Sequence, residues 1–116
     1  MEWTIDAKSP SDPIVVSIIG AMDLYSAPQF AQALLLELDE TGRRLLIDFS
    51  NMDYLDSTGV GAIIRIIQHM NIKRGDLRFS GLGGTPKRVL EMSNIISLMK
   101  VHPHQRDVLT LWGDSR

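Results

Sequence analysis

The fold of this chain is decided by Leu45-Leu46-Ile47-Asp48-Phe49 and by the polar cluster Asp56-Ser57-Thr58-Gly59 that follows it. The first stretch is a short apolar run, which is typical of a buried parallel strand. After the polar cluster, apolar residues recur at the spacing of a helix, at Val60, Ile63, Ile64 and Ile67. We therefore expect a strand, a loop over residues 50–55, and a helix that begins at Asp56 and Ser57 and stops at Gly75.

Strand and helix signals also precede this stretch. Residues 3–7 alternate apolar and polar, and residues 14–19 are rich in β-branched side chains, so we expect two strands joined by the turn at residues 9–13. After a loop over residues 20–25, Ser26-Ala27-Pro28-Gln29 predicts the start of a helix, with Ser26 as N-cap and Gln29 placed for a capping box. Gly42 can end that helix. Its apolar stripe is Ala27, Phe30, Ala31, Leu34, Leu35 and Leu38.

The remainder of the chain continues the alternation. We expect a strand over residues 76–80, a loop over 81–84, a helix capped by Thr85 that runs to about Ser93, a short strand within 95–101 and a small helix over 106–111. This order predicts an α/β fold with a mostly parallel mixed sheet, an N-terminal edge hairpin and helices after successive strands. The loops at residues 20–26 and 50–59 should then share the rim at the carboxyl ends of the strands.

The composition indicates an ordinary globular protein and excludes several kinds of function. With 116 residues and a net charge of -2, we expect one domain over residues 1–116 and no general attraction to nucleic acid or to a membrane surface. The charge is uneven, at -7 over residues 1–56 and +5 over residues 57–116. No cysteine is present, which excludes thiol chemistry. The acidic start lacks the pattern of an export signal, so we expect a cytoplasmic protein.

The cluster Asp56-Ser57-Thr58-Gly59 supports two interpretations. An acidic or hydroxyl side chain at this point can simply cap the helix, which stabilises it by about 1 kcal/mol. Two adjacent hydroxyls beside a carboxylate at an exposed helix N-terminus are also typical of a phosphoacceptor, because the helix end tolerates an added dianion. The apolar side chains in the two loops are equally ambiguous, since they can pack at the edge of the core or form a partner surface. They are Leu24, Tyr25, Met52, Tyr54 and Leu55.

Enzymatic and metal-binding alternatives find weaker support. A serine hydrolase needs a base near Ser57 and usually a G-x-S-x-G order, which this cluster lacks. An aspartic protease loop reads Asp-Thr-Gly or Asp-Ser-Gly, one residue shorter than the cluster. Asp23, Asp53 and Asp56 could hold a divalent ion in principle, and His102 with His104 could do so only with a third ligand. We therefore expect no metal, no cofactor and no enzyme activity.

Four stretches of the sequence resemble the STAS-domain anti-sigma-factor antagonists, also called anti-anti-sigma factors. They are Gly20-Ala21-Met22-Asp23, Ser26-Ala27-Pro28, Leu46-Ile47-Asp48-Phe49-Ser50 and, as the most specific, Tyr54-Leu55-Asp56-Ser57-Thr58-Gly59-Val60-Gly61. The resemblance covers nearly the whole chain. Ala21 departs from the family pattern, in which an acidic residue is common at this position.

The resemblance implies a switch. The unmodified domain binds an anti-sigma factor that is also a serine kinase, which frees the sigma factor, and phosphorylation reverses the binding. Ser57 matches the phosphoacceptor, with Thr58 as the alternative hydroxyl, and a serine/threonine phosphatase resets it. ATP enters as the kinase's substrate. The partner-binding residues implied here are Asp23, Leu24, Tyr25, Ser26, Tyr54, Asp56, Ser57, Thr58 and Gly59.

Two other functions stay open at this point. The same fold serves as a subunit of stress-signalling or lipid-transport complexes, and hydrolysis at Ser57 or Asp56 is the enzymatic alternative. The sequence is compatible with a monomer or a weak dimer.

Overall fold

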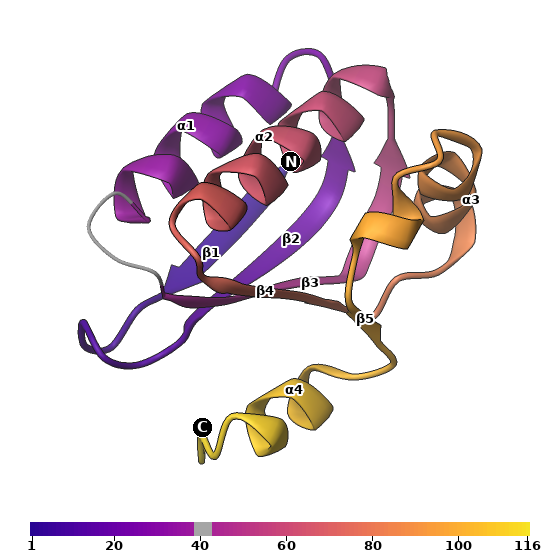
Figure 1. Cartoon of the computed structure of the whole chain (residues 1–116). Coiled ribbons are helices and arrows are strands. Elements are labelled where there is room, and N and C mark those ends of the chain that lie inside the picture. The colour runs from indigo at the N-terminus through magenta and orange to yellow at the C-terminus, as the bar shows by residue number, and fades with distance from the viewer. Residues whose placement is uncertain (39–42) are drawn as a thin grey trace.

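The chain forms one five-stranded sheet in the order β1-β2-β3-β4-β5 (Figure 1). The computed structural model describes residues 1–38 and 43–116. β1 pairs antiparallel with β2, and all later neighbours pair parallel. The expected α/β fold with an edge hairpin is therefore confirmed. The strands are β1 (Glu2–Asp6), β2 (Ile14–Met22), β3 (Arg44–Leu55), β4 (Asp76–Ser80) and β5 (Val101–His102).

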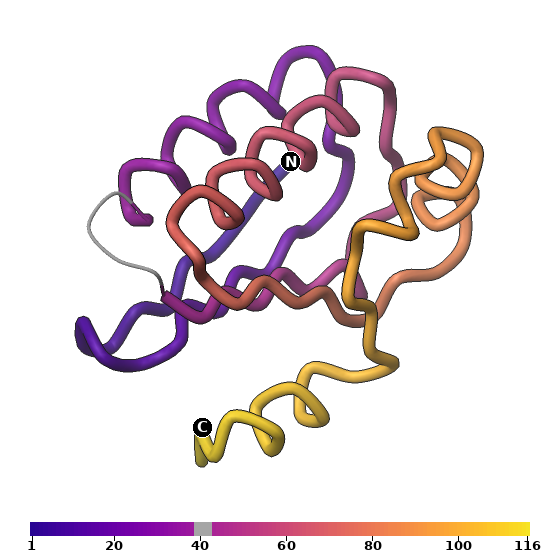
Figure 2. Tube along the Cα trace, viewed as in Figure 1, coloured from indigo at the N-terminus to yellow at the C-terminus, as the bar shows by residue number. Residues whose placement is uncertain are grey.

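The helices lie on both faces of this sheet. α1 (Ala27–Glu37) and α2 (Ser57–Ile72) lie side by side on one face, while α3 (Gly84–Met92) and the 3-10 turn η1 (Ile96–Leu98) lie beside them (Figure 1). After β5 the chain passes beneath the sheet, so that α4 (Gln105–Leu111) lies on the opposite face (Figure 2). None of the helices in the described part of the chain is long and apolar enough to cross a membrane.

The main core lies between the sheet and the pair α1 and α2. Phe30 and Leu34 of the predicted α1 stripe are fully buried, as are Ile63 and Ile66 of α2. Each such side chain stabilises the fold by about 1.5–3 kcal/mol. A smaller cluster on the other face joins Val15 and Leu46 to α4 through Val108 and Leu109. The first halves of β2 and β3 are therefore buried on both faces, which explains their continuous apolar runs.

The two loops expected at the rim are shorter than predicted, because both strands continue. β2 runs to Met22, so the loop expected over residues 20–25 begins only at Asp23. β3 runs to Leu55, so the expectation of a loop over residues 50–55 was wrong. β4 pairs with β3 only as far as Asp48, and beyond that point β3 pairs with β2 alone through register shifts. A strand with one unpaired side carries polar residues, and that polarity gave residues 50–55 the pattern of a loop.

One predicted helix cap was wrong, and the other holds its position without its capping hydrogen bond. Ser26 occupies the N-cap position of α1, but its side chain makes no capping hydrogen bond, because its hydroxyl is held by the turn before the helix. α3 is capped by Gly83, one residue before the helix begins at Gly84, and the expected cap Thr85 lies inside the helix. The predicted stop at Gly42 lies outside the described residues. The strand expected within residues 95–101 is largely the turn η1, with β5 reduced to two residues.

A buried acid joins the middle strands. Asp48 of β3 is only 7% exposed, and its Oδ1 accepts hydrogen bonds from the hydroxyls of Ser50 and Ser80, each at 2.8 Å. Gly81 has a φ of +70° and passes so close to Ser50 that a side chain would displace this pair. The acid is therefore satisfied by hydroxyl donors, as a buried polar group requires.

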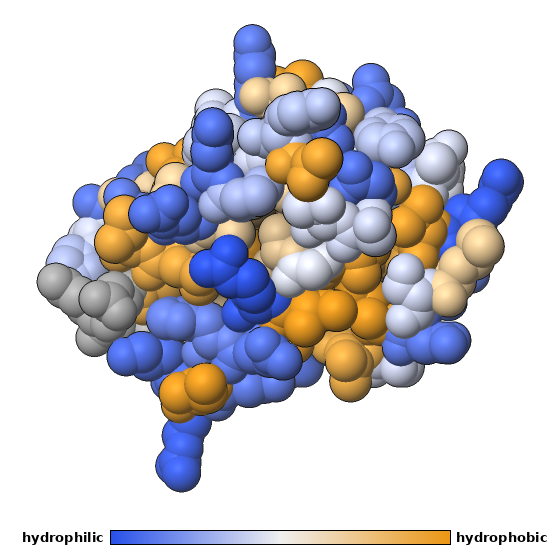
Figure 3. All heavy atoms as spheres, turned by 90° about the horizontal axis from the view of Figure 1, so that it is seen from above, coloured by the Kyte–Doolittle hydropathy of each residue, from blue (hydrophilic) through white to orange (hydrophobic). Residues whose placement is uncertain are grey.

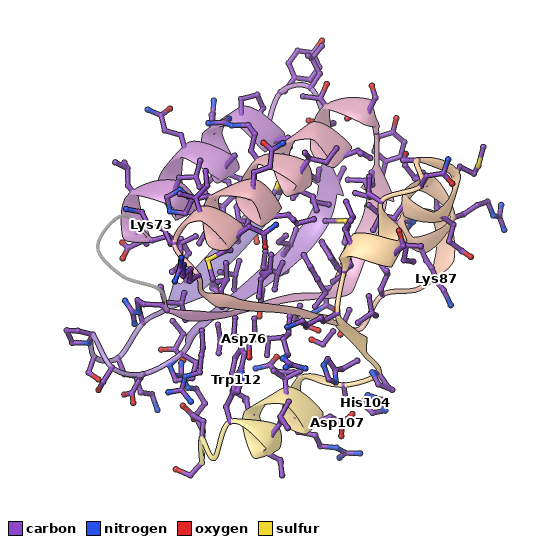
Figure 4. The ribbon with its side chains drawn as sticks, in the orientation of Figure 1. Lys73, Asp76, Lys87, His104, Asp107 and Trp112 are labelled. Atoms are coloured by element: carbon purple, nitrogen blue, oxygen red, sulfur yellow. The ribbon has the colours of Figure 1, made fainter. Side chains whose placement is uncertain are left out.

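The C-terminal segment is tied to the sheet through Trp112. Trp112 lies next to Asp76 (Figure 4), and its indole Nε1 donates to Asp76 Oδ2 at 3.0 Å. The Arg44 guanidinium lies 5.8 Å from the centre of the Trp112 ring. Partial burial tends to raise the pKa of Asp76, but the hydrogen bonds from Trp112 and Arg78, with the charges of Arg78 and Lys100, outweigh it and hold that pKa below its usual value. The Trp112 indole and the Arg78 guanidinium therefore stabilise the ionised form of Asp76.

Candidate functional site

The candidate site lies at the rim where β2 and β3 end together. Met22 and Leu55, the last residues of these strands, are paired in register, so the turn after β2 and the start of α2 are neighbours. The Asp56 N–H donates to the Met22 carbonyl oxygen at 3.3 Å, and the Leu24 N–H donates to Asp56 Oδ2 at 3.1 Å. The prediction that these two segments share one rim is confirmed.

Asp56 joins the two segments through its carboxylate. It is the N-cap of α2, and its Oδ1 accepts from the Gly59 N–H at 3.0 Å. Its Oδ2 accepts from Leu24, which lies 32 residues earlier. Each oxygen therefore already has a partner within the chain. The capping interpretation of Asp56 is confirmed. The carboxylate also holds the turn that follows β2 against the N-terminus of α2.

Asp23 holds that turn in shape. Its Oδ1 accepts from the hydroxyl of Ser26 at 3.0 Å and from the N–H groups of Tyr25 and Ser26 at 3.0 and 3.1 Å. Chiefly through the Ser26 hydroxyl, these bonds lower the pKa of Asp23 below its usual value. Asp23 is therefore ionised near neutral pH, and Ser26 contributes to the site by orienting this acid.

Ser57 is exposed at the N-terminus of α2. It is the first residue of the helix and is exposed, while Thr58 after it is half-buried. Among the described residues no hydrogen bond engages the Ser57 hydroxyl. The hydroxyl is therefore accessible from solvent, with the N-terminal end of the α2 dipole behind it.

Exposed apolar side chains lie in the two segments that lead into α1 and α2. Tyr25 is 82% exposed, Leu24 60% and Tyr54 47%, so these three do not pack at the core edge. Met52 and Leu55 are buried and do belong to the core. Large exposed side chains of this kind are typical of protein-binding surfaces.

Gly59 allows the first turn of α2 to pack closely against the end of β2. It is buried, and a Cβ at this position would lie 2.8 Å from the Met22 carbonyl oxygen and closer still to the Leu55 side chain. Cβ atoms are not found this close to other heavy atoms, so a larger residue would push α2 away from the rim. Gly59 therefore acts through packing and sets the position of Ser57.

The enzymatic and metal-binding alternatives find no assembled site in the described part of the chain. No group of three His, Asp or Glu side chains there is placed to hold a metal ion. His69 lies twelve residues along α2 from Ser57, about 18 Å at 1.5 Å per residue, with its Nε2 3.5 Å from the Leu38 carbonyl oxygen. His102 Nε2 lies 3.2 Å from Arg78, and His104 caps α4. None of the three is close to Ser57.

Sequence reasoning missed two features of this site. The bond from Leu24 to Asp56 joins residues far apart in the chain, and no local pattern indicates it. A groove between α1 and α2 opens next to Thr58 and is lined by Pro28, Gly61, Ala62 and Arg65. The small residues at 61 and 62 were the available signal, but their meaning depends on the helix that lies opposite.

Comparisons with known proteins agree on one family. The family model described as STAS domain matches residues 4–108. The chain is 28% identical over 101 residues to the anti-sigma-B factor antagonist of Bacillus subtilis (strain 168), which covers 87% of this chain and 92% of that protein.

Solved structures show the same fold at low identity. The anti-sigma factor antagonist SpoIIAA in its unphosphorylated form has a TM-score of 0.79 at 14% identity, covering 99% of this chain and 100% of that chain. SpoIIAA of Bacillus in its phosphorylated form has a TM-score of 0.69 at 13% identity, covering 95% and 99%. A part of the murine anion transporter Slc26a9 has a TM-score of 0.76 at 14% identity, covering 93% of this chain and 19% of the transporter. These structural likenesses concern the fold alone.

Proposed function

Because the chain belongs to the STAS domain family, we propose that it is an anti-sigma factor antagonist controlled at Ser57. Its unphosphorylated form binds an anti-sigma factor that is also a serine kinase, and this binding releases a sigma factor. Phosphorylation of Ser57 ends the binding, and a serine/threonine phosphatase restores it. The observation that carries the proposal is the exposed Ser57 at the first position of α2, on a rim whose two segments also carry exposed apolar side chains.

The unphosphorylated rim offers a surface for this partner. Tyr25, Leu24 and Tyr54 are exposed in the segments that precede α1 and α2 and provide apolar contact area. Tyrosine is among the residues that contribute most to protein interfaces, because a large rigid ring is buried at little entropic cost. Asp23 adds a negative charge that a basic side chain of the kinase can pair with. Asp56 acts as a positioning residue, since both of its oxygens are occupied within the chain.

Phosphorylation acts on the complex more than on the fold. A phosphate adds about -1.5 to -2 charges, next to Asp56 and on the rim that carries Asp23. The helix N-terminus stabilises this charge in the free protein. A partner surface shaped for a neutral hydroxyl meets like charge, extra volume and a desolvation cost. Shifting a binding equilibrium from 99:1 to 1:99 takes about 5.5 kcal/mol, which several such effects can supply together.

The direct test is to incubate the chain with the serine-kinase anti-sigma factor of its own cell and ATP, and to locate the phosphate by mass spectrometry. We expect it at Ser57. Thr58→Ala is the matched control, because it removes the neighbouring hydroxyl and should still be phosphorylated. A phosphate found only at another residue would refute the assignment.

Binding measurements test the switch itself. Ser57→Ala should bind the kinase like the unmodified chain and never be released, whereas Ser57→Asp should bind more weakly because it places a charge on the rim. Calorimetry on these variants and on the phosphorylated chain gives the affinities. Equal affinity for the phosphorylated and unmodified forms contradicts the mechanism.

A further inference from the structure

A groove lies between α1 and α2 directly beside Ser57. Its walls are Pro28, Thr58, Gly61, Ala62 and Arg65, and its volume is about 270 Å³. That is far more than the ~30 Å³ of one liquid water molecule. Figure 3 looks down on this side of the molecule, where apolar side chains lie exposed between charged ones. The groove adjoins the candidate rim, because Thr58 lines it and directly follows Ser57.

The groove is open because α2 carries no side chain at Gly61. A Cβ built on Gly61 would meet nothing within 4 Å, in contrast to Gly59 two residues before it. Pro28 and Ala62 contribute short apolar walls, so the accessible surface of the groove is mainly apolar. An aliphatic side chain can enter and contact the helix backbone closely. A charged or amide side chain would lose hydration there without gaining a hydrogen bond.

Arg65 gives this groove a charged end. It is the single lysine or arginine within α1 and α2 and lies four residues after Gly61, on the same face of the helix. It is exposed, and within the described residues no acid forms an ion pair with it. The rim acids Asp23 and Asp56 lie at the other end. From Ser57 to Arg65 this surface changes from acidic through apolar to basic over about 12 Å along the helix.

We propose that this groove is the specificity pocket for the kinase partner. An aliphatic side chain of the anti-sigma factor enters the groove, and an acidic residue next to it on the same segment pairs with Arg65. The complementary segment carries a basic residue toward Asp23 and an acidic residue toward Arg65. This inference rests on the proposed function, and it specifies the aliphatic and charged side chains that the partner must carry. A partner with a basic residue opposite Arg65 is rejected by like charge.

Two variants test the groove on the unphosphorylated, full-length chain. Gly61→Leu fills it and should raise the Kd for the anti-sigma factor at least tenfold, because the partner's side chain is excluded. Arg65→Glu should raise the Kd at least tenfold, since it sets like charges opposite each other. Lys87→Glu, on exposed α3, makes the same charge change away from the groove and should keep the Kd within twofold. Circular dichroism checks that each variant folds.

The outcomes separate this inference from the proposed function. One outcome refutes the groove alone: the unmodified chain binds and Ser57→Asp weakens binding, while Gly61→Leu and Arg65→Glu bind normally. The groove is then not the specificity pocket, and the proposed control at Ser57 is still supported. If the unmodified chain does not bind a serine-kinase anti-sigma factor, the proposed function fails and the groove's assignment fails with it. If the two variants change only the self-association of the chain in sedimentation, the occupant is a second copy and the assignment is overturned.

Discussion

Replacing Gly59 by alanine, compared with the same change at Gly61, tests how α2 is held at the rim. Both glycines lie in the first two turns of one helix, so the chemical change and the helix are the same. The surroundings differ. A Cβ at 59 would collide with the Met22 backbone and the Leu55 side chain, and a Cβ at 61 would meet open space.

The expected free energies follow from these surroundings. Alanine in place of helical glycine stabilises by about 0.5–1 kcal/mol, and that gain is all that changes at Gly61. At Gly59 the added methyl overpacks a buried site, which costs about 1–3 kcal/mol, and the Met22 carbonyl cannot swing aside like a flexible side chain. We therefore expect Gly61→Ala to be more stable than the parent, and Gly59→Ala to lie about 2 kcal/mol below Gly61→Ala.

Urea unfolding followed by circular dichroism gives both values. With unchanged slopes, the difference in midpoint converts directly to free energy. If Gly59→Ala is as stable as Gly61→Ala, the close approach of α2 to β2 is not present in solution and the argument for the position of Ser57 fails. The binding of Gly59→Ala to the kinase provides a second readout, and it should weaken because Ser57 moves with the helix.

The remaining predictions concern two carboxylates. Asp56→Ala removes the acceptor for both Gly59 and Leu24 and should lower the unfolding free energy by about 2 kcal/mol. Asp56→Asn keeps one acceptor oxygen and should lose about half of that free energy. Equal losses in urea titrations would argue against the Asp56 carboxylate accepting from both N–H groups. The pKa of Asp76 in the folded chain lies below the usual value of an aspartate, so the unfolded chain binds more protons as the pH falls. The stability that Asp76 contributes is therefore present above the usual aspartate pKa and is lost as the pH falls through the lower, folded-state pKa. Asp76→Asn should therefore flatten the decline of unfolding free energy between about pH 5 and pH 2, and an unchanged decline would show that Trp112 and Arg78 do not hold the ionised form.

Local signals located most of the elements. The start of α2 at Asp56 and Ser57 follows from a capping side chain before a helical period, both of which act within a few residues. β4 has the predicted bounds, and it lies between Gly75 and Gly81, which are local signals of its two ends. The errors arose where a distant segment overrides local preference. Residues 50–55 form a strand because β2 lies beside them. Ser26 is the N-cap residue of α1, but its hydroxyl makes no capping hydrogen bond because it donates to Asp23 instead.

The sequence by itself determined the alternation of strands and helices and the polar cluster at the head of α2, because hydrophobic period and capping act between near neighbours in the chain. Only the tertiary structure decided that Leu24 reaches Asp56, that Gly59 is confined while Gly61 is open, and that Pro28 faces Arg65 across a groove. These contacts join β2, α1 and α2, which become neighbours only once β2 and β3 have paired in parallel with α1 between them in sequence. A contact between segments far apart in the chain depends on where the complete fold places each backbone. The spacing of residues within one segment does not predict it.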